Sequence, residues 1–256
     1  MNYRLDISYD GSAYSGFQTQ VNHVTVQRVL ENRLAKVLGR KIIVNASGRT
    51  DAGVHALGQT VNFKADINIA PERLQYALNN ALPGNIVVLN TQIVDDDFHA
   101  RFSAIGKTYA YKILYTRTRS PFVDNYCWQI DKKLDVPAIH LATKMLIGEH
   151  DFASFRSAGS VQGSAVRSIY DADWKKNIPA QPLDFARVGE EYWEFIITGN
   201  GFLYHMVRNI VGTLVQVGLG KMSLEEFERF FLSCKREGRC FIAPPQGLYL
   251  VEVMYA

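Results

Sequence analysis

The sequence predicts an α+β fold built from two ferredoxin-like halves, residues 1–105 and 106–256. The first half reads strand, helix, strand, strand, helix, strand, which is the split β-α-β-β-α-β arrangement. The second half repeats that order without obvious sequence identity. Two such halves suggest mainly antiparallel sheets with helices on one side and a pseudo-twofold axis between the halves. A groove where such halves meet is a common place for a ligand site.

The elements of the first half follow from apolar periodicity and from residues that begin or end helices. Apolar and polar residues alternate over residues 3–9, which predicts the first strand. Thr25 is placed to cap a helix whose apolar stripe ends at Gly39. Pro71 opens a second helix that Pro83-Gly84 stops, and residues 86–94 then read as a strand.

The second half gives the same kinds of signal. Ser223 and Glu226 form a capping box, with Met222 and Phe227 as its hydrophobic staple, so a short extra helix begins there. The most apolar helix lies over residues 203–217. The other expected segments are a helix at 136–147 and strands at 109–115, 170–174, 193–197 and 248–255, with a polar connection containing Pro179 and Pro182 between the middle two strands.

Residues 47–56 hold an acid, a base, an imidazole and two glycines within ten positions. Apolar alternation over 42–46 before this segment and over 61–63 after it predicts two strands that grip it as a loop. Glycine allows tight turns, so we expect Arg49 and Asp51 to be presented there, beside a cleft. On spacing alone a second interpretation stays open, in which Asp51 closes an Asx-turn and Arg49 is its surface ion-pair partner.

The run Gly-Arg-Thr-Asp-Ala-Gly-Val-His-Ala at residues 48–56 resembles the segment around the catalytic aspartate of the tRNA pseudouridine synthase A family. Further blocks are similar to that family in the same order along the chain. They lie at residues 9–20, 98–109, 148–155, 199–208 and 243–250.

This resemblance implies an RNA-modifying isomerase that converts uridine to pseudouridine at positions 38, 39 and 40 of the tRNA anticodon stem-loop. One carboxylate suffices for that reaction, and it would be Asp51, as a nucleophile or as a base. Arg49 would hold the carboxylate ionised and fill the gap left by the flipped base. No cofactor is required. The resemblance also implies an RNA cleft between the halves and a homodimer whose two subunits share one tRNA.

Three further residues are implied as substrate-binding ones. Tyr109 resembles the tyrosine that stacks on the target base, although a core aromatic of the sheet is nearly as good an interpretation of the residue alone. Arg208 lies in an apolar helix and must meet a carboxylate, a phosphate or water, since an unpaired buried guanidinium is costly. Leu248 would form an apolar wall under the base, unless it is ordinary strand packing.

Basic residues near the middle of the chain are candidates for tRNA phosphate contacts, above all Arg101 and Lys107. Most solvent-facing basic residues make no such contact. The total charge of +3, from 28 Lys and Arg against 25 Asp and Glu, is too small to indicate a nucleic-acid partner by itself. The weaker candidates are Arg117, Arg119, Arg156 and Arg167.

The sequence gives no sign of a membrane, a metal or a disulfide framework. The N-terminus shows no basic-then-apolar leader and the chain has no long uncharged apolar run, so we expect a cytoplasmic protein. Three cysteines lack ligand spacing, which favours reduced, buried thiols. His55 is expected to be structural, with its imidazole bonded to loop backbone. No helix-spaced metal ligand set is formed by His99, His140 and His150.

Two alternatives of other classes remain open. Paired ferredoxin-like units with basic and aromatic strands also suit a noncatalytic RNA-binding module. A carboxylate beside Arg49 and His55 would also suit a hydrolase that cleaves a nucleoside or sugar. No second carboxylate stands at the spacing that such hydrolysis normally uses.

Overall fold

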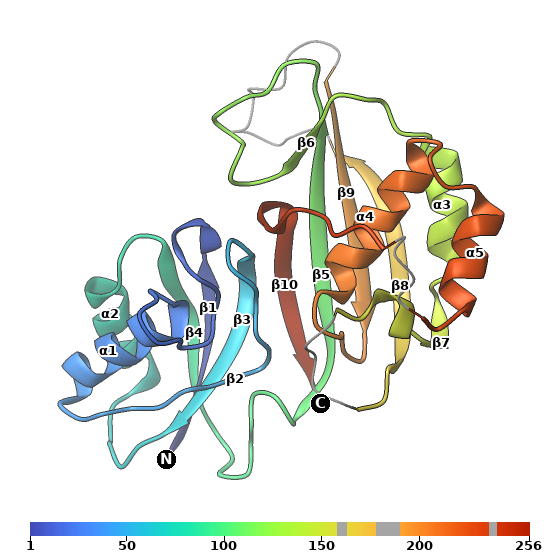
Figure 1. Cartoon of the computed structure of the whole chain (residues 1–256). Coiled ribbons are helices and arrows are strands. Elements are labelled where there is room, and N and C mark those ends of the chain that lie inside the picture. The colour runs from blue at the N-terminus through green and yellow to red at the C-terminus, as the bar shows by residue number, and fades with distance from the viewer. Residues whose placement is uncertain (158–162, 178–189, 236–239) are drawn as a thin grey trace. The chain divides into compact units, whose positions relative to one another are not determined.

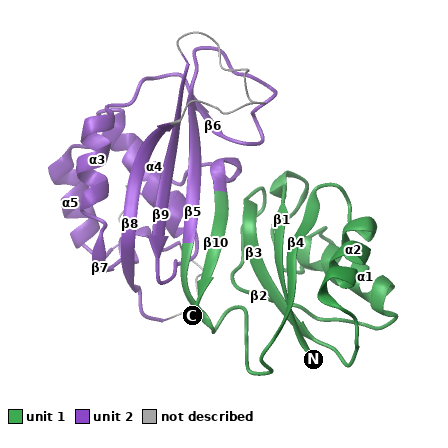
Figure 2. Ribbon diagram, turned by 180° about the vertical axis from the view of Figure 1, so that it is seen from behind, with its two compact units in different colours: residues 1–107, 249–256 green, residues 108–248 purple. Residues whose placement is uncertain are grey.

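A computed structural model of the protein describes residues 1–157, 163–177, 190–235 and 240–256. The chain forms two compact units, shown in Figure 2. Unit 1 comprises residues 1–107 and 249–256, and unit 2 comprises residues 108–248. Each unit combines a sheet with helices, which confirms the α+β class.

Unit 1 has the predicted order of elements. Its elements are β1 (Asn2–Tyr9), α1 (Val26–Leu38), β2 (Asn45–Ala46), β3 (His55–Lys64), α2 (Pro71–Ala81), β4 (Ile86–Val94) and the late strand β10 (Leu248–Tyr255). Strand β1 lies between β4 and β3 and pairs antiparallel with both. The other edge of β3 is shared: β2 pairs with it antiparallel, and β10 pairs with it parallel at His55 and Ala56.

Both helices of unit 1 cover the same face of its sheet (Figure 1). Alternate residues of β1 point into that interface, and Tyr3, Leu5 and Ile7 are completely buried. Between them Arg4 and Asp6 face the other side, where they form an ion pair at 3.0 Å. A half-apolar strand of this kind is what the period-two pattern predicts.

The strand expected over residues 42–46 is shorter in the structure, because only β2 joins the ladder. Ile42 and Val44 are buried as the alternation indicates. However, the backbone of Val44 bonds to side chains of α1 instead of a strand: its N–H donates to Glu31 Oε1 at 3.1 Å and its carbonyl accepts from Gln27 Nε2 at 3.4 Å. Helix side chains thus take the place of a neighbouring strand.

The strands of unit 2 run in the order β5-β9-β8-β7, with β6 parallel to β5 and the helices gathered on one face (Figure 1). Two short strands, β6 and β7, are not among the predicted elements. The polar connection with Pro179 and Pro182 lies outside the described residues. The elements are β5 (Ala104–Tyr115), β6 (Trp128–Ile130), α3 (Val136–Lys144), β7 (Gly148–Asp151), β8 (Val166–Asn177), β9 (Glu191–Gly199), α4 (Met206–Gly218) and α5 (Leu224–Leu232).

The predicted helix boundaries hold where a capping group defines them. The capping box of α5 is present, since Ser223 Oγ accepts from Glu226 N–H and Glu226 Oε2 accepts from Ser223 N–H. Helix α4 begins later than expected, at Met206, because His205 before it has a left-handed backbone (φ 61°). The hydrophobic pattern alone does not reveal that break.

The division of the chain at residues 105 and 106 stays a prediction, and the compact units differ from it at the C-terminus. There β10 pairs with β3, so residues 249–256 belong with the first 107 residues. Among the helices described, none has the length and apolar character needed to span a membrane.

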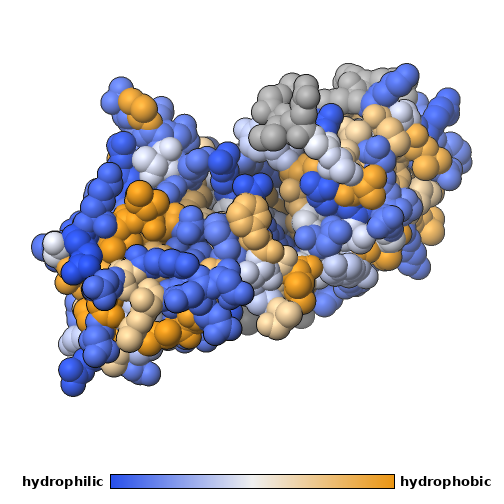
Figure 3. All heavy atoms as spheres, turned by 90° about the horizontal axis from the view of Figure 1, so that it is seen from below, coloured by the Kyte–Doolittle hydropathy of each residue, from blue (hydrophilic) through white to orange (hydrophobic). Residues whose placement is uncertain are grey.

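The three cysteines are free thiols in different surroundings. Cys127 is buried, as expected, but Cys234 is exposed and Cys240 is partly exposed. The expectation of buried thiols therefore holds only for Cys127 and is wrong for Cys234 and Cys240. Figure 3 shows apolar residues interspersed with hydrophilic ones on the face it presents.

Candidate active site

The segment that carries Arg49 and Asp51 joins β2 to β3 and is held firmly where it begins. Ser47 is completely buried and its N–H donates to the Thr60 carbonyl at 2.9 Å. Its hydroxyl donates to Gln59 Oε1 at 2.6 Å, and Gln59 Nε2 donates to the Gly48 carbonyl at 2.9 Å. The start of the loop is thus tied to β3 by backbone and side chain together.

Thr50 anchors the middle of the loop. Its hydroxyl lies 2.7 Å from the Tyr9 hydroxyl, and its carbonyl accepts from Phe17 N–H at 3.0 Å. Thr50 is buried, whereas Arg49 before it is exposed and Asp51 after it is half-buried. Burying the central residue turns its two charged neighbours toward the surface, as expected for a loop that presents functional groups.

Two glycines make the tight packing of this region possible. Gly53 has a φ of 77°, in the left-handed region that favours glycine, and completes the turn closed by Val54 N–H on the Asp51 carbonyl at 3.1 Å. Gly16, with a φ of 89°, lies so close that a Cβ there would be 2.8 Å from the Thr50 carbonyl oxygen. The segment around Gly16 therefore packs directly against the backbone of the Asp51 loop.

The imidazole of His55 bonds to loop backbone, as predicted. Its Nδ1 accepts from Gly11 N–H at 3.1 Å, and its ring stacks on Tyr249 with centroids 4.7 Å apart. Because Nδ1 accepts that bond, a neutral imidazole carries its proton on Nε2. The Asp10 carboxylate, 3.2 Å from the same nitrogen, forms an ion pair with it only when the ring is protonated.

Lys107 and Arg101, the two leading candidates for phosphate contacts, lie in different surroundings. Arg101 is exposed, with its guanidinium 5.5 Å from the ring centroid of exposed Phe102. Lys107 is partly buried and its Nζ donates to the Ser47 carbonyl at 2.7 Å. Burial, followed by the charge of Arg101, lowers the pKa of Lys107 to about 8. Lys107 therefore contacts the stem of the Asp51 loop directly.

Unit 2 carries the remaining predicted residues. Tyr109, in β5, is nearly buried and meets Phe202 edge-on at 5.1 Å between ring centroids. Arg208 lies in the first turn of α4, where its Nε donates to the Ala243 carbonyl at 2.9 Å. Ala243 N–H donates back to the Arg208 carbonyl at 3.0 Å, so the pair fixes the segment that leads to Leu248.

Leu248 is buried and begins β10. Just before it, a Cβ on Gly247 would lie 2.6 Å from Tyr111 Cζ, so glycine is required for this approach. The Tyr111 hydroxyl donates to the Pro244 carbonyl at 2.7 Å. Arg208, Leu248 and Tyr111 are thus linked within unit 2 through residues 243–247.

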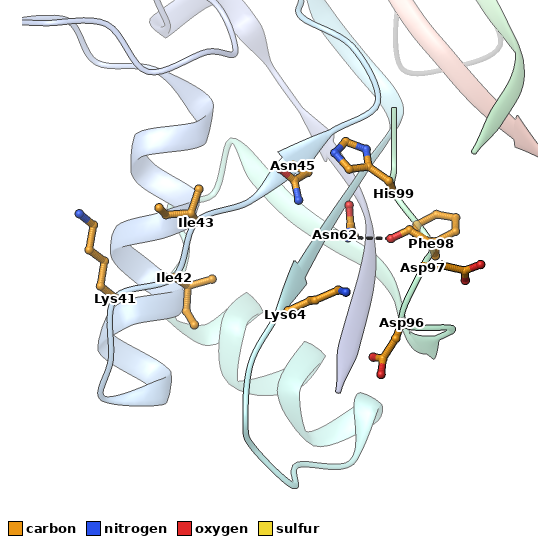
Figure 4. Close-up of a pocket in the computed structure, with 10 residues that line it drawn as sticks. All are labelled: Lys41, Ile42, Ile43, Asn45, Asn62, Lys64, Asp96, Asp97, Phe98 and His99. Atoms are coloured by element: carbon orange, nitrogen blue, oxygen red, sulfur yellow. Dashed lines mark hydrogen bonds between the residues drawn. The ribbon is translucent and has the colours of Figure 1, made fainter. Parts of the chain in front are cut away.

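A hollow of about 550 Å³ on unit 1 is lined by none of the predicted site residues (Figure 4). Asn62 points into it while donating to the Phe98 carbonyl at 3.2 Å. Lys41 and Lys64 on its wall are offset by Asp96 and Asp97, so its lining does not favour one sign of charge.

Among the described residues, no group of three His, Cys, Asp or Glu side chains could hold a metal ion.

Several supports of the Asp51 loop were missed from the sequence. They are Tyr9, Ser47 and Gln59, and the contact that Lys107 makes. Tyr9 and Gln59 lie in strands and read as ordinary strand residues, while Lys107 reads as a surface cation. Only the polar character of Ser47, Thr50 and Gln59 at positions that prove to be fully or nearly buried would have indicated a hydrogen-bonded cluster.

Comparisons with known proteins agree on one class, the enzymes that modify tRNA by making pseudouridine. A family model described as tRNA pseudouridine synthase matches residues 7–103 and 142–256. The chain belongs to the tRNA pseudouridine synthase family. This confirms the resemblance noted in the sequence and makes the protein an enzyme that isomerises uridine in tRNA.

Individual relatives match over nearly the whole chain. A protein of Thermoanaerobacter sp. is 43% identical over 254 residues, which cover 99% of each chain. One from Acetivibrio thermocellus is 41% identical over 254 residues, again 99% of both. One from Listeria monocytogenes is 42% identical over 255 residues, covering 99% of this chain and 98% of the relative. Each of these relatives is named tRNA pseudouridine synthase A.

Proposed function

We propose that this enzyme converts uridine to pseudouridine at positions 38, 39 and 40 of the tRNA anticodon stem-loop, with Asp51 as the catalytic carboxylate. The observation that carries the proposal is the loop of Asp51 itself. Its flanking residues are fixed by buried hydrogen bonds at Ser47 and Thr50, while Asp51 stays half-buried. A carboxylate held in this way is oriented before the substrate arrives, which lowers the cost of reaching the transition state.

The reaction moves the uracil without losing it. The bond from N1 of uracil to C1′ of the ribose breaks, the base rotates, and C5 joins C1′. The proton on C5 then leaves to water and N1 is protonated, so atoms and electrons balance without an oxidant or reductant. Asp51 acts either as the nucleophile on the ring or sugar or as the base that removes a sugar proton. Both roles need an ionised carboxylate.

Arg49 is proposed to support the flipped base. The residue is exposed and lies two positions before Asp51 on the same loop. Flipping a stacked base costs a few kcal/mol, on the order of what a side chain inserted into the vacated space can offset.

Residues of unit 2 are proposed to bind the target nucleotide. Tyr109 offers an aromatic ring for stacking, Arg208 offers a guanidinium, and Leu248 offers an apolar wall. Arg101 is proposed to contact phosphate.

A homodimer that holds one tRNA with both subunits is part of the same proposal, and sedimentation of the enzyme with and without tRNA tests it.

The decisive experiment follows hydrogen at C5. Unmodified tRNA tritiated at C5 of uridine is incubated with the wild type, with Asp51→Asn and with Asp66→Asn, which removes an exposed carboxylate elsewhere in unit 1. We expect the wild type and Asp66→Asn to release tritium to water and Asp51→Asn to release none. Transcripts with a single uridine at 38, 39 or 40 locate the reaction.

Three results would contradict the proposal. Tritium release by folded Asp51→Asn would remove the aspartate from catalysis. Release that persists when positions 38, 39 and 40 carry no uridine would move the reaction to another part of the tRNA. Free uracil among the products would indicate glycosidic hydrolysis instead.

A further inference from the structure

Lys107 occupies an unusual place for a lysine. Its side chain is partly buried, and its Nζ donates to the carbonyl of Ser47, which is 60 positions earlier in the sequence. Ser47 is the residue from which the Gly48-Arg49-Thr50-Asp51 segment departs. A lysine that serves RNA phosphates alone would keep its ammonium in solvent, so this burial indicates another role.

The stem of the loop is held from two sides. Gln59, in β3, donates to the Gly48 carbonyl at 2.9 Å, while Lys107 donates to the preceding carbonyl, that of Ser47, at 2.7 Å. Two consecutive peptide groups therefore each accept a bond from a side chain outside the loop. This double attachment fixes the direction in which the chain leaves β2.

Gly48 leaves the room that the ammonium needs. A Cβ at this position would lie 3.1 Å from Lys107 Nζ, which is tighter than an ordinary contact. The glycine has no positive φ that would require it on backbone grounds. The backbone conformation therefore does not explain why residue 48 is a glycine, but the space needed by the Lys107 ammonium does.

The bond carries a charge, which makes it stronger than a neutral one. Burial of the ammonium, aided by the Arg101 charge, lowers the pKa of Lys107 to about 8, so the group remains mainly protonated at neutral pH. The bond to the Ser47 carbonyl does not fully offset the cost of burying this charge, since the pKa stays below its ordinary value of 10.5.

We propose that Lys107 is a positioning residue for Asp51, acting through the Ser47 carbonyl. This inference rests on the proposed function and deepens it. Lys107 sets the geometry of the loop that presents Arg49 and Asp51, and its main effect is on the rate of the chemical step. It differs from a phosphate contact, which would act on tRNA affinity and on its dependence on salt.

The test separates these two effects with one substitution and two measurements. Lys107→Met removes the donor and keeps an unbranched side chain. We expect its single-turnover rate at saturating enzyme to fall about 10- to 100-fold, as for loss of a hydrogen bond to a charged group. Its tRNA dissociation constant and the slope of that constant with KCl stay those of the wild type.

Control variants keep the result specific. Lys36→Met removes an exposed lysine from α1 of the same unit, and we expect it to leave rate and affinity unchanged. Lys107→Arg keeps a cationic donor and should recover part of the lost rate, which a role in packing alone would not explain. Wild type and Asp51→Asn run in the same assay, so failure of the proposed function appears in them, independently of Lys107.

The outcomes decide between the roles. An unchanged single-turnover rate in folded Lys107→Met overturns the inference. Weaker binding with a reduced salt slope at an unchanged rate assigns Lys107 to phosphate contact. Should Lys107→Met fail to fold, Lys107→Gln gives the answer, because its shorter, neutral side chain removes the charged donor. The positioning role requires a slower chemical step with unchanged tRNA affinity in that variant, and a wild-type rate there would refute it.

Discussion

At the scale of single residues, the Asp51 loop depends on buried polar contacts. The Tyr9 and Thr50 hydroxyls lie 2.7 Å apart and both residues are buried. Burial raises the pKa of Tyr9 to about 12, so the phenol stays protonated and able to donate. The pair ties the middle of the loop to β1, the central strand of unit 1.

Thr50→Val should destabilise the protein by about 1–3 kcal/mol, since it leaves the buried Tyr9 hydroxyl without this partner. Tyr9→Phe should cost a similar amount, and the double variant less than the sum of the two, because each removes the same bond. Urea unfolding of the four proteins measures the coupling. Strictly additive losses would show that the hydroxyls do not interact.

Thr91→Val is the matched control for this double-mutant cycle of Thr50 and Tyr9. Thr91 is also a buried threonine of the unit 1 sheet, but among the described residues its hydroxyl has no hydrogen-bond partner. Replacing it with valine removes no bond, so we expect a free energy of unfolding equal to or slightly above that of the wild type.

Lys107 also predicts how stability depends on pH. Its pKa falls from an ordinary 10.5 to about 8 in the folded protein. Between these values the unfolded chain holds a proton that the folded protein has released, so this residue's contribution to stability rises with pH. Below about pH 8 both states are protonated, and the burial of the charge costs stability in full.

The measurement is a difference between two proteins. Lys107→Met lacks the titrating group, whereas tyrosines and cysteines titrate alike in both. The free energy of unfolding of the wild type minus that of the variant should therefore increase between about pH 8 and pH 10.5. A difference that stays flat over this range would place the pKa of Lys107 near its ordinary value.

At the scale of elements, the segment before β2 depends on helix α1. Glu31 Oε1 accepts from Val44 N–H at 3.1 Å and from Gln27 Nε2 at 2.9 Å. This carboxylate supplies the hydrogen bond that a neighbouring strand would otherwise give to Val44. The approach to the Asp51 loop is therefore held by side chains of α1, with Glu31 bonded to the Val44 amide and Gln27 to its carbonyl.

Glu31→Ala should free the Val44 amide and reduce the free energy of unfolding by about 1 kcal/mol. Hydrogen exchange of that amide should become faster, while amides of β1 keep their protection. Asn32→Ala, at the next and exposed position of α1, is the control and should leave exchange unchanged. Equal exchange of Val44 in both variants would show that Glu31 does not hold the segment.

The sequence predicts those elements whose signals are local. Helices α1 and α5 begin where Thr25 and Ser223 cap them, because a cap and the turn it satisfies lie within a few residues. Strands β6 and β7 are only three and four residues long, too short to show a periodic pattern, and each is defined by its pairing with another strand. The shortened β2 has the same cause.

At the scale of the whole molecule, the compact units predict how the chain can be divided. The boundary expected from the sequence, at residues 105 and 106, separates β10 from β3. A fragment of residues 1–105 then lacks the parallel partner at His55, the ring stacked on that imidazole and the Tyr255 hydroxyl that donates to the Ala100 carbonyl at 2.7 Å.

We expect that fragment to unfold at lower urea concentration and less cooperatively than residues 1–107 joined to residues 249–256 by a flexible linker. Loss of the strand paired with β3 exposes both apolar side chains and an open strand edge. Circular dichroism during urea titration compares the two. Equal midpoints would show that the first 105 residues are a complete folding unit and would support the division drawn from the sequence.

The candidate site shows how far sequence reasoning reaches. The resemblance identifies Asp51 and Arg49 because they stand in one short run of residues. It does not reveal that Tyr9, 41 positions before Thr50, or Lys107, 60 positions after Ser47, holds that run in place. Such contacts depend on the register of paired strands, which a single sequence specifies only weakly.

The pairing of β10 with β3 also sets the order in which the parts of the chain can fold during synthesis. Residues 1–107 leave the ribosome long before residues 249–256, yet the sheet edge beside His55 is complete only when the later segment arrives. Domains normally fold as units from the N-terminus onward during synthesis. Here the unit that carries Asp51 must wait for translation to pass through unit 2, so a prematurely terminated chain would display the aspartate loop on an unfinished scaffold.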